Sequence, residues 1–161
     1  MSENSKLREQ LLYHISGHGA HIDFAAAVEG FPFDLAGKHV PNLTHTAWQL
    51  VFHLQIAQRD MLAFCTDPKH VSPEYPSGYW PETEAPKDEE QWKRTVSSFQ
   101  TELQAMAGLV KDPGNDLLAP FPHGSGQNLL QEAIQIIDHN SYHIGQLVDI
   151  RMLLGVPVRD W

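Results

Sequence analysis

Residues 138–155 read DHNSYHIGQLVDIRMLLG, an apolar run of helical character with two histidines near its middle. These histidines, His139 and His143, are four residues apart, and side chains at that spacing lie on one face of a helix. Their imidazoles are therefore close enough to hold one metal ion. The spacing fits equally well two core residues whose nitrogens find other partners, so the surrounding sequence has to separate these interpretations.

The helix that contains this run is long. Ser125 is a suitable N-cap residue, and the apolar periodicity continues to Leu154. Gly155 and Pro157 then stop the helix. We therefore expect the last helix to begin at Ser125 and to end at Leu154.

A second helix carries the other sequence of interest, WQLVFHLQIAQRDML, at residues 48–62. Asn42 or Thr44 can cap it after Pro41, and it is expected to continue to about Thr66. Its apolar residues alternate spacings of three and four, the pattern of a packed helix face: Ala47, Leu50, Leu54, Ala57, Met61 and Phe64.

Two further helices are expected on either side of this one. The first spans Ser5 to about Glu29 and ends near Gly30. The third opens at Asp88, with Gln91 three residues later in the arrangement of a capping box. Its apolar face ends at the sequence DPGND and consists of Trp92, Val96, Phe99, Leu103, Met106 and Val110.

Residues 67–87 form the longest connection. They contain five prolines and the aromatic stretch EYPSGYWPE, which suit neither a helix interior nor a central strand. No alternation of period two indicates a strand elsewhere. The sequence therefore predicts an all-α protein, a four-helix bundle with a long crossover loop between helices two and three, formed as one domain over residues 1–161.

Composition and charge exclude several functional classes. The 161 residues include 11 Lys and Arg against 20 Asp and Glu, a formal net charge of −9, which opposes binding to nucleic acid. The chain starts without the pattern of a signal peptide and has no run long enough to span a membrane, so we expect a cytoplasmic location without membrane contact. With a single cysteine, Cys65, any metal must rely on histidines and carboxylates.

Burial favours a shared metal at the histidine pair. His139 and His143 lie on the helix face of Ile136, Leu147 and Ile150, so both point into the protein. Two adjacent buried imidazoles cannot both be charged at low cost, and each nitrogen needs a partner. A metal ion bound to both would satisfy these demands.

The third ligand predicted is His53, which flanks Leu50 and Leu54 on the second helix. Three histidine ligands leave coordination positions open for water or substrate, as in catalytic metal sites. Asp60 lies seven residues after His53 and Gln146 seven after His139, so each returns to nearly the same face and can support the ligands.

An alternative cluster lies in the first expected helix. His14, His18 and His21 also follow a three-four spacing along an apolar stripe. Gly17 and Gly19 weaken the helix at this point, and a histidine on an apolar stripe is more often a core residue or a partner contact than a ligand. Both clusters therefore remain candidates, with the second one less favoured.

Together, WQLVFHLQIAQRDML and IDHNSYHIGQLVDIRMLLG resemble the DinB-like family of bacterial four-helix proteins, described as metal-dependent enzymes. The resemblance covers nearly the whole chain and rests on a histidine in helix two followed by an H-x-x-x-H-x-G-Q run in the last helix. It implies that His53, His139 and His143 bind one divalent ion. It also implies a homodimer, and for some relatives the transfer of small thiols such as bacillithiol or mycothiol or their use as cofactors.

Two functions follow as hypotheses. The first is a metal-dependent enzyme that acts on a small-molecule substrate, either as a hydrolase or as a small-thiol S-transferase. Imidazole and thiolate ligands favour zinc, with nickel and iron as alternatives. The second is a non-enzymatic, dimeric bundle that binds a metal or ligand without turnover. No catalytic acid or base besides the metal is identified.

Overall fold

The computed structural model describes residues 3–158, and these form helices without any strand. The predicted all-α class is therefore confirmed for the part of the chain described. An isolated bridge between Pro120 and Asn128 is the nearest approach to a sheet. The elements are α1 (Glu3–Ile15), α2 (Phe24–Val28), η1 (Phe33–Leu35), α3 (Ala47–Thr66), η2 (Ser77–Tyr79), α4 (Glu89–Lys111) and α5 (Leu129–Leu153).

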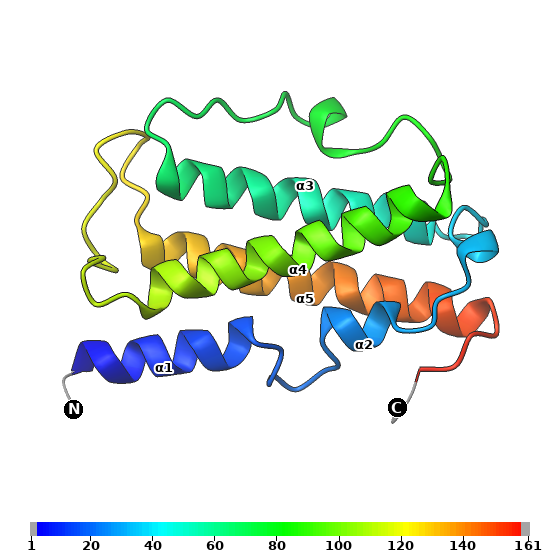
Figure 1. The fold of residues 1–161 in the computed structure, drawn as a ribbon, viewed down its shortest axis with the longest axis horizontal. Helices are drawn as coiled ribbons and strands as arrows, with labels where there is room; N and C mark the ends of the chain where they lie inside the picture. The colour runs from blue at the N-terminus through cyan, green and yellow to red at the C-terminus, as the bar shows by residue number, and fades with distance from the viewer. Residues whose placement is uncertain (1–2, 159–161) are drawn as a thin grey trace.

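The three longest helices, α3, α4 and α5, lie side by side (Figure 1). Helix α3 packs against both α4 and α5, and α1 contacts α4 and α5 on the other side of the molecule. After α3, the chain leads back along that helix through η2 before α4 begins (Figure 1). This return path brings η2 against α3, where it can act on side chains of that helix.

The first expected helix is broken in two, so the prediction of one helix over residues 5–29 was wrong. Helix α1 ends at Ile15, and α2 begins only at Phe24. Between them Gly17 has a φ of +79°, and a Cβ there would overlap the side chain of Asp23. Asp23 in turn caps α2, because its Oδ1 accepts a hydrogen bond from the Ala26 amide at 2.8 Å. The helix-breaking residues of this turn therefore outweighed the apolar periodicity on which the prediction of one continuous helix rested.

Caps define the start of each long helix, although two of the predicted caps were misplaced. Helix α3 begins after Thr46 rather than after Asn42 or Thr44, with a reciprocal capping box between Thr46 and Gln49. Asn42 instead adopts a φ of 67° in a turn before the helix. Asn42, Thr44 and Thr46 are all suitable N-cap residues by type. Only Thr46 has Gln49 three residues later to complete the capping box, and the prediction overlooked this pair.

Of the predicted caps of the other two long helices, one was correct and one was wrong. Asp88 caps α4 as predicted, by accepting a hydrogen bond from the Gln91 amide at 2.8 Å. Helix α5 is capped by Asn128 and not by Ser125. The helix ends as predicted, since its last residue is Leu153 and Gly155 follows with a φ of +73°.

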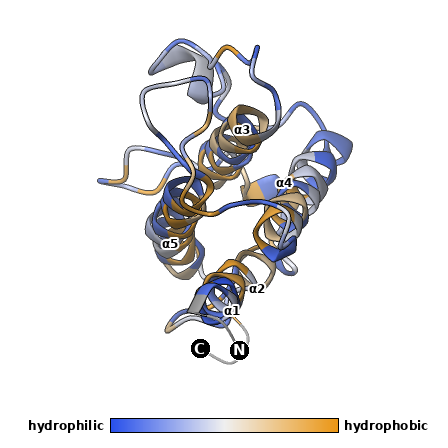
Figure 2. Ribbon diagram, turned by 90° about the vertical axis from the view of Figure 1, so that its left-hand side faces the viewer, coloured by the Kyte–Doolittle hydropathy of each residue, from blue (hydrophilic) through white to orange (hydrophobic). Residues whose placement is uncertain are grey.

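The hydrophobic core is divided into two clusters, and Figure 2 shows apolar residues on the helix faces turned toward each other. One cluster, which includes Trp48, Phe99 and Leu147, joins α2, α3, α4 and the second half of α5. The other, which includes Leu11 and Met106, joins α1, α4 and the first half of α5. Within the described residues, no helix has the length and hydropathy needed to cross a bilayer.

Buried arginines tie the chain ends to this core. The Arg8 guanidinium donates to the carbonyl oxygens of Val110 and Asp112 where α4 ends. The Arg151 guanidinium donates to Ala27 O and to Pro157 O, each at 2.8 Å. Because backbone carbonyls at helix ends lack partners within the helix, these bonds satisfy groups that burial would otherwise leave unpaired.

We predict that Thr46→Ala destabilises the protein by about 1–2 kcal/mol, because it removes the α3 cap. It also removes the hydrogen bond from Thr46 Oγ1 to Glu84 O at 2.7 Å. Urea unfolding followed by circular dichroism measures the effect. Thr46→Ser keeps the hydroxyl and should retain most of the stability; equal losses in both variants would show that the Thr46 methyl group, and not the cap, is responsible.

Candidate metal centre

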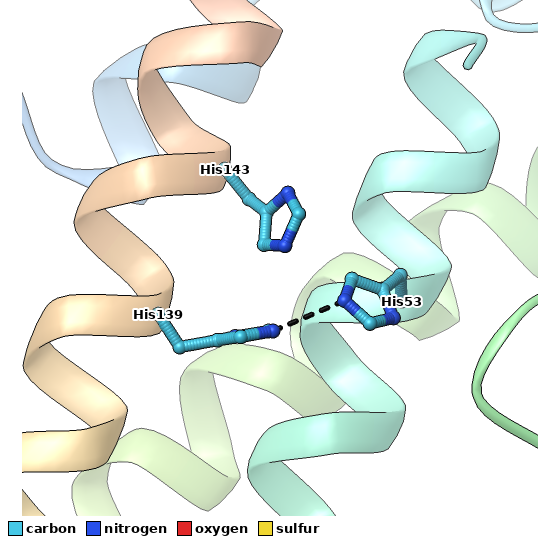
Figure 3. A group of neighbouring side chains, drawn as sticks. All are labelled: His53, His139 and His143. Carbon is cyan, nitrogen blue, oxygen red and sulfur yellow. Dashed lines mark hydrogen bonds between the residues drawn. The ribbon is translucent and has the colours of Figure 1, made fainter. Parts of the chain in front are cut away.

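Three histidines from two helices meet between α3 and α5 (Figure 3). His53 belongs to α3, and His139 and His143 belong to α5. Each offers one ring nitrogen to a group of atoms that lie within 4.8 Å of one another. Among the described residues, no other group of three or more histidine, cysteine or carboxylate side chains is close enough together to hold a metal ion.

Hydrogen bonds to the outer nitrogens orient two of these rings. His53 Nδ1 lies 3.0 Å from the carbonyl oxygen of Tyr79, which can only accept, so Nδ1 carries the proton. His143 Nδ1 lies 2.7 Å from Gln146 Oε1 and donates to it in the same way. In the neutral rings the Nε2 lone pairs are then free, which is the tautomer that metal-ligating histidines adopt when the other nitrogen is held by an oxygen.

The third ring, His139, has a different environment. Its Nε2 lies 3.0 Å from His53 Nε2, and since His53 Nε2 is bare, His139 must donate there when no metal intervenes. His139 Nδ1 is then left buried without a hydrogen-bond partner. Asn140 Oδ1 is buried and unpaired as well, and the Asn140 side chain favours protonation of His139, although the geometry is short of a full hydrogen bond.

This arrangement fits a metal ion. Two nitrogens at 2.0–2.1 Å from a tetrahedral zinc ion are about 3.3 Å apart, close to the His53–His139 separation of 3.0 Å. Coordination would replace the contact between the two nitrogens and place the proton of His139 on Nδ1, beside Asn140. The short separation of the two Nε2 atoms is thus compatible with a cation that both rings share.

Burial keeps all three rings neutral near pH 7. It lowers the pKa of His53 to about 4, against the opposing effect of the Tyr79 carbonyl, and the neighbouring His143 and His45 lower it slightly further. Burial, followed by the neighbouring His143 and His53, lowers the pKa of His139 to about 4. Burial also lowers the pKa of His143, against the effect of Gln146. A neutral imidazole is the form that binds metal, so the site is ready to coordinate without first losing protons.

Trp80 covers the centre from the side of the connecting segment. Its indole is parallel to the His53 ring within 3°, at a centroid distance of 3.9 Å, and it stacks on His45 at the same distance. Two rings cannot share one face of an indole at that separation, so Trp80 lies between the two histidines. The stack fixes the His53 ring plane and keeps water away from it.

The two predicted supporting residues have different roles. Gln146 directly contacts one of the three candidate metal ligands, because its Oε1 accepts a hydrogen bond from His143 Nδ1. Asp60 instead accepts from the Tyr79 hydroxyl at 2.6 Å and lies 2.6 Å from His70 Nε2. It therefore acts on the centre through Tyr79, whose backbone carbonyl holds His53.

The alternative cluster is not assembled as a metal site. His14 lies in the last turn of α1, whereas His18 and His21 lie in the connection to α2. The His18 ring packs near Tyr13, and the His21 nitrogens lie beside Ile22 O and Ser141 Oγ. The break in the first helix removes the common face that the spacing had suggested.

Sequence reasoning missed three parts of the centre, namely the Tyr79 carbonyl, the Trp80 indole and His45. A backbone carbonyl leaves no trace in a sequence, because every residue has one. The aromatic stretch at residues 74–82 is visible in the sequence, but its position over His53 depends on the path of a proline-rich segment. His45 precedes the true helix cap by one residue, and its contact with Trp80 follows from that cap.

No protein-family model matches the chain, and no curated protein matches it. The function is therefore argued from the geometry of the three histidines.

We predict that Gln146→Leu weakens metal binding about 10- to 100-fold, since it removes the acceptor that orients His143. Competition against a chromophoric chelator measures the affinity. Gln146→Glu keeps an acceptor and should bind as tightly as wild type, and Gln135→Leu, at an exposed position of the same helix, should have no effect. Wild-type affinity in Gln146→Leu would contradict this role.

We predict that the metal-free protein loses stability between pH 6.5 and 4. An unfolded histidine takes up its proton near pH 6.5, but His53 and His139 do so in the folded state only near pH 4. The unfolded chain therefore binds more protons in this interval, and the free energy of unfolding falls by up to about 3 kcal/mol for each of the two histidines.

Urea unfolding of chelator-treated protein at several pH values tests this prediction. His139→Gln should flatten the pH dependence, whereas the exposed control His18→Gln should keep the wild-type slope. The same slope in both variants would assign the pH dependence to other groups.

Proposed function

We propose that this protein is a metal-dependent enzyme in which His53, His139 and His143 hold one divalent ion. The observation that carries the proposal is the convergence of three ring nitrogens within 4.8 Å, with the opposite nitrogens of two rings already bound to oxygen atoms. A set of core histidines would have no need for this common orientation.

We further propose that the chain belongs to the DinB-like type and forms a four-helix bundle. In this interpretation α1 and α2 together form the broken first helix, α3, α4 and α5 are the other three, and residues 67–88 are the crossover loop. The resemblance is supported by the meeting of the helix-two histidine with the H-x-x-x-H-x-G-Q run. It also leads us to propose a homodimer, for which α5 offers exposed apolar side chains at Ile134, Tyr142, Met152 and Leu153.

Zinc is the metal we propose, with nickel and iron as alternatives, because imidazole nitrogens suit all three ions. Three protein ligands leave a coordination position open, as in catalytic zinc sites. When bound, the ion would act as a Lewis acid that lowers the pKa of a coordinated water or thiol. The reaction class we propose is accordingly hydrolysis, or transfer of a small thiol to an electrophile.

The protein residues around the centre have separate tasks. Tyr79 and Gln146 hold the Nδ1 protons, so the ligand nitrogens face inward. Trp80 shields His53 on one face. A cleft of about 300 Å³ is lined by His45, Tyr142, Gln146 and Asp149 and adjoins the centre through Gln146, which contacts His143; we propose it as the approach of a polar small-molecule substrate.

The decisive test is metal content by elemental mass spectrometry, on protein purified without a metal-affinity tag. We expect close to one equivalent per chain in wild type and its loss in His139→Ala, because two remaining ligands bind far more weakly. His18→Ala, from the cluster that is not assembled, should keep the metal. Full metal content in His139→Ala would contradict the proposed ligand set.

Assays of the loaded protein then separate enzyme from binding protein. Turnover of esters, amides or thiol-electrophile pairs that disappears with chelator and in His139→Ala would support the enzyme. Stoichiometric metal without turnover across such a panel would favour the alternative, a metal-binding bundle without catalysis. A stability gain on adding zinc to wild type, absent in His139→Ala, is the accompanying control, since a ligand of the native state raises stability by mass action.

A further inference from the structure

Two buried side-chain amides connect α4, through α3, to the part of α5 that carries the candidate metal ligand His139. Gln58 Nε2 lies 2.6 Å from Phe99 O, and Gln58 Oε1 lies 3.1 Å from Asn140 Nδ2. Gln58 is completely buried, and Asn140 is only 7% exposed. Because Asn140 directly follows His139 in the chain, this series of hydrogen bonds ends beside the candidate metal centre.

The carbonyl oxygen of Phe99 determines how both amides are oriented. It can only accept, so the end of Gln58 that faces it is the NH2 group. Gln58 Oε1 then faces Asn140 and can only accept as well, so Asn140 turns its NH2 group toward Gln58. The other end of Asn140, Oδ1, is therefore fixed as an acceptor, and it is buried without a donor.

His139 has an unpaired nitrogen next to this unpaired oxygen. Its Nε2 donates to His53 Nε2, the contact drawn in Figure 3, and its Nδ1 is then bare and without a partner. Burial has the largest effect on the pKa of His139 and lowers it, whereas the Asn140 side chain raises this pKa, as an oxygen facing the ring does. A bare ring nitrogen and an amide oxygen both accept, so they cannot pair while the proton is on Nε2.

To serve as a metal ligand, His139 must move its ring proton. A coordinating Nε2 uses its lone pair and cannot keep a hydrogen, so the neutral ring carries its proton on Nδ1. Nδ1 is then a donor beside Asn140 Oδ1, the acceptor whose direction the amides have fixed. The other two ligands already have acceptors for their Nδ1 protons, namely Tyr79 O and Gln146 Oε1.

We propose that Asn140 is the positioning residue of His139: its Oδ1 accepts the Nδ1 proton of the ligating ring, and Gln58 keeps that oxygen turned toward His139. The inference rests on the proposed metal site. His139 is then the one ligand whose tautomer changes, from Nε2–H in the metal-free protein to Nδ1–H in the loaded protein. His53 and His143 carry the proton on Nδ1 in both states.

Nitrogen-15 NMR of the imidazole rings tests this inference, because protonated and bare nitrogens of a neutral ring have well-separated chemical shifts. Zinc is added to the chelator-treated full chain near neutral pH, and the signals absent from His139→Ala are those of His139. We expect Nε2–H at His139 before zinc and Nδ1–H after it. The His53 and His143 rings should remain Nδ1–H throughout.

Zinc affinity of variants, measured by competition against a chromophoric chelator, is the second readout. Asn140→Leu removes the acceptor and should weaken zinc binding about 10- to 100-fold. Asn140→Asp gives up the bond to Gln58 but keeps an oxygen for Nδ1, and it should bind zinc as tightly as wild type does. Met106→Ala is the control for general destabilisation, since it removes a fully buried side chain from the other core cluster and should leave zinc affinity unchanged.

The inference would be overturned if His139 has the same tautomer with and without zinc, or if Asn140→Leu binds zinc as tightly as Met106→Ala. Equal losses of affinity in Asn140→Leu and Asn140→Asp would also overturn it, because the acceptor would then be irrelevant. Zinc binding that depends on His139 without a change of tautomer contradicts this inference alone and leaves the proposed metal site intact. No zinc binding by wild type would overturn both.

Discussion

The hydrogen bond from His53 to the Tyr79 carbonyl is the interaction on which the centre depends. It connects a buried side chain of α3 to the segment that leads from α3 to α4. It fixes the protonated nitrogen of His53 and therefore the direction of its free lone pair. It also places the next residue, Trp80, against the His53 ring. The path of the proline-rich connection therefore determines how the His53 imidazole is oriented toward the other two histidines.

Elements that follow from a repeating apolar pattern could be predicted from the sequence, whereas features that depend on a single turn could not. Apolar spacing located α3, α4 and α5, and inward-facing histidines on two of them identified the candidate ligands. The break after Ile15 was missed, because glycine at a left-handed turn and a cap at Asp23 outweigh periodicity over a few residues. The Tyr79 acceptor could not be predicted, since its position is set by tertiary packing.

Helix α5 faces two different surroundings through adjacent residues. His139 faces the candidate metal centre, and Asn140, the next residue, lines a largely apolar cavity between α2, α4 and α5. Asn140 donates to Gln58 Oε1 at 3.1 Å, and Gln58 donates to Phe99 O at 2.6 Å. These buried amides connect α5 to α3 and α3 to α4 through the apolar interior, and they leave Asn140 Oδ1 without a partner.

The stacking of Trp80 on His53 has a thermodynamic consequence. A cation bound at His53 would draw electron density from its ring, and an electron-rich indole in parallel contact would stabilise that change. Any free energy that Trp80 contributes to cation binding is then equal to the free energy that the cation contributes to holding Trp80 in place. The connecting segment would in this sense influence the affinity of the site, although it contributes no ligand atom.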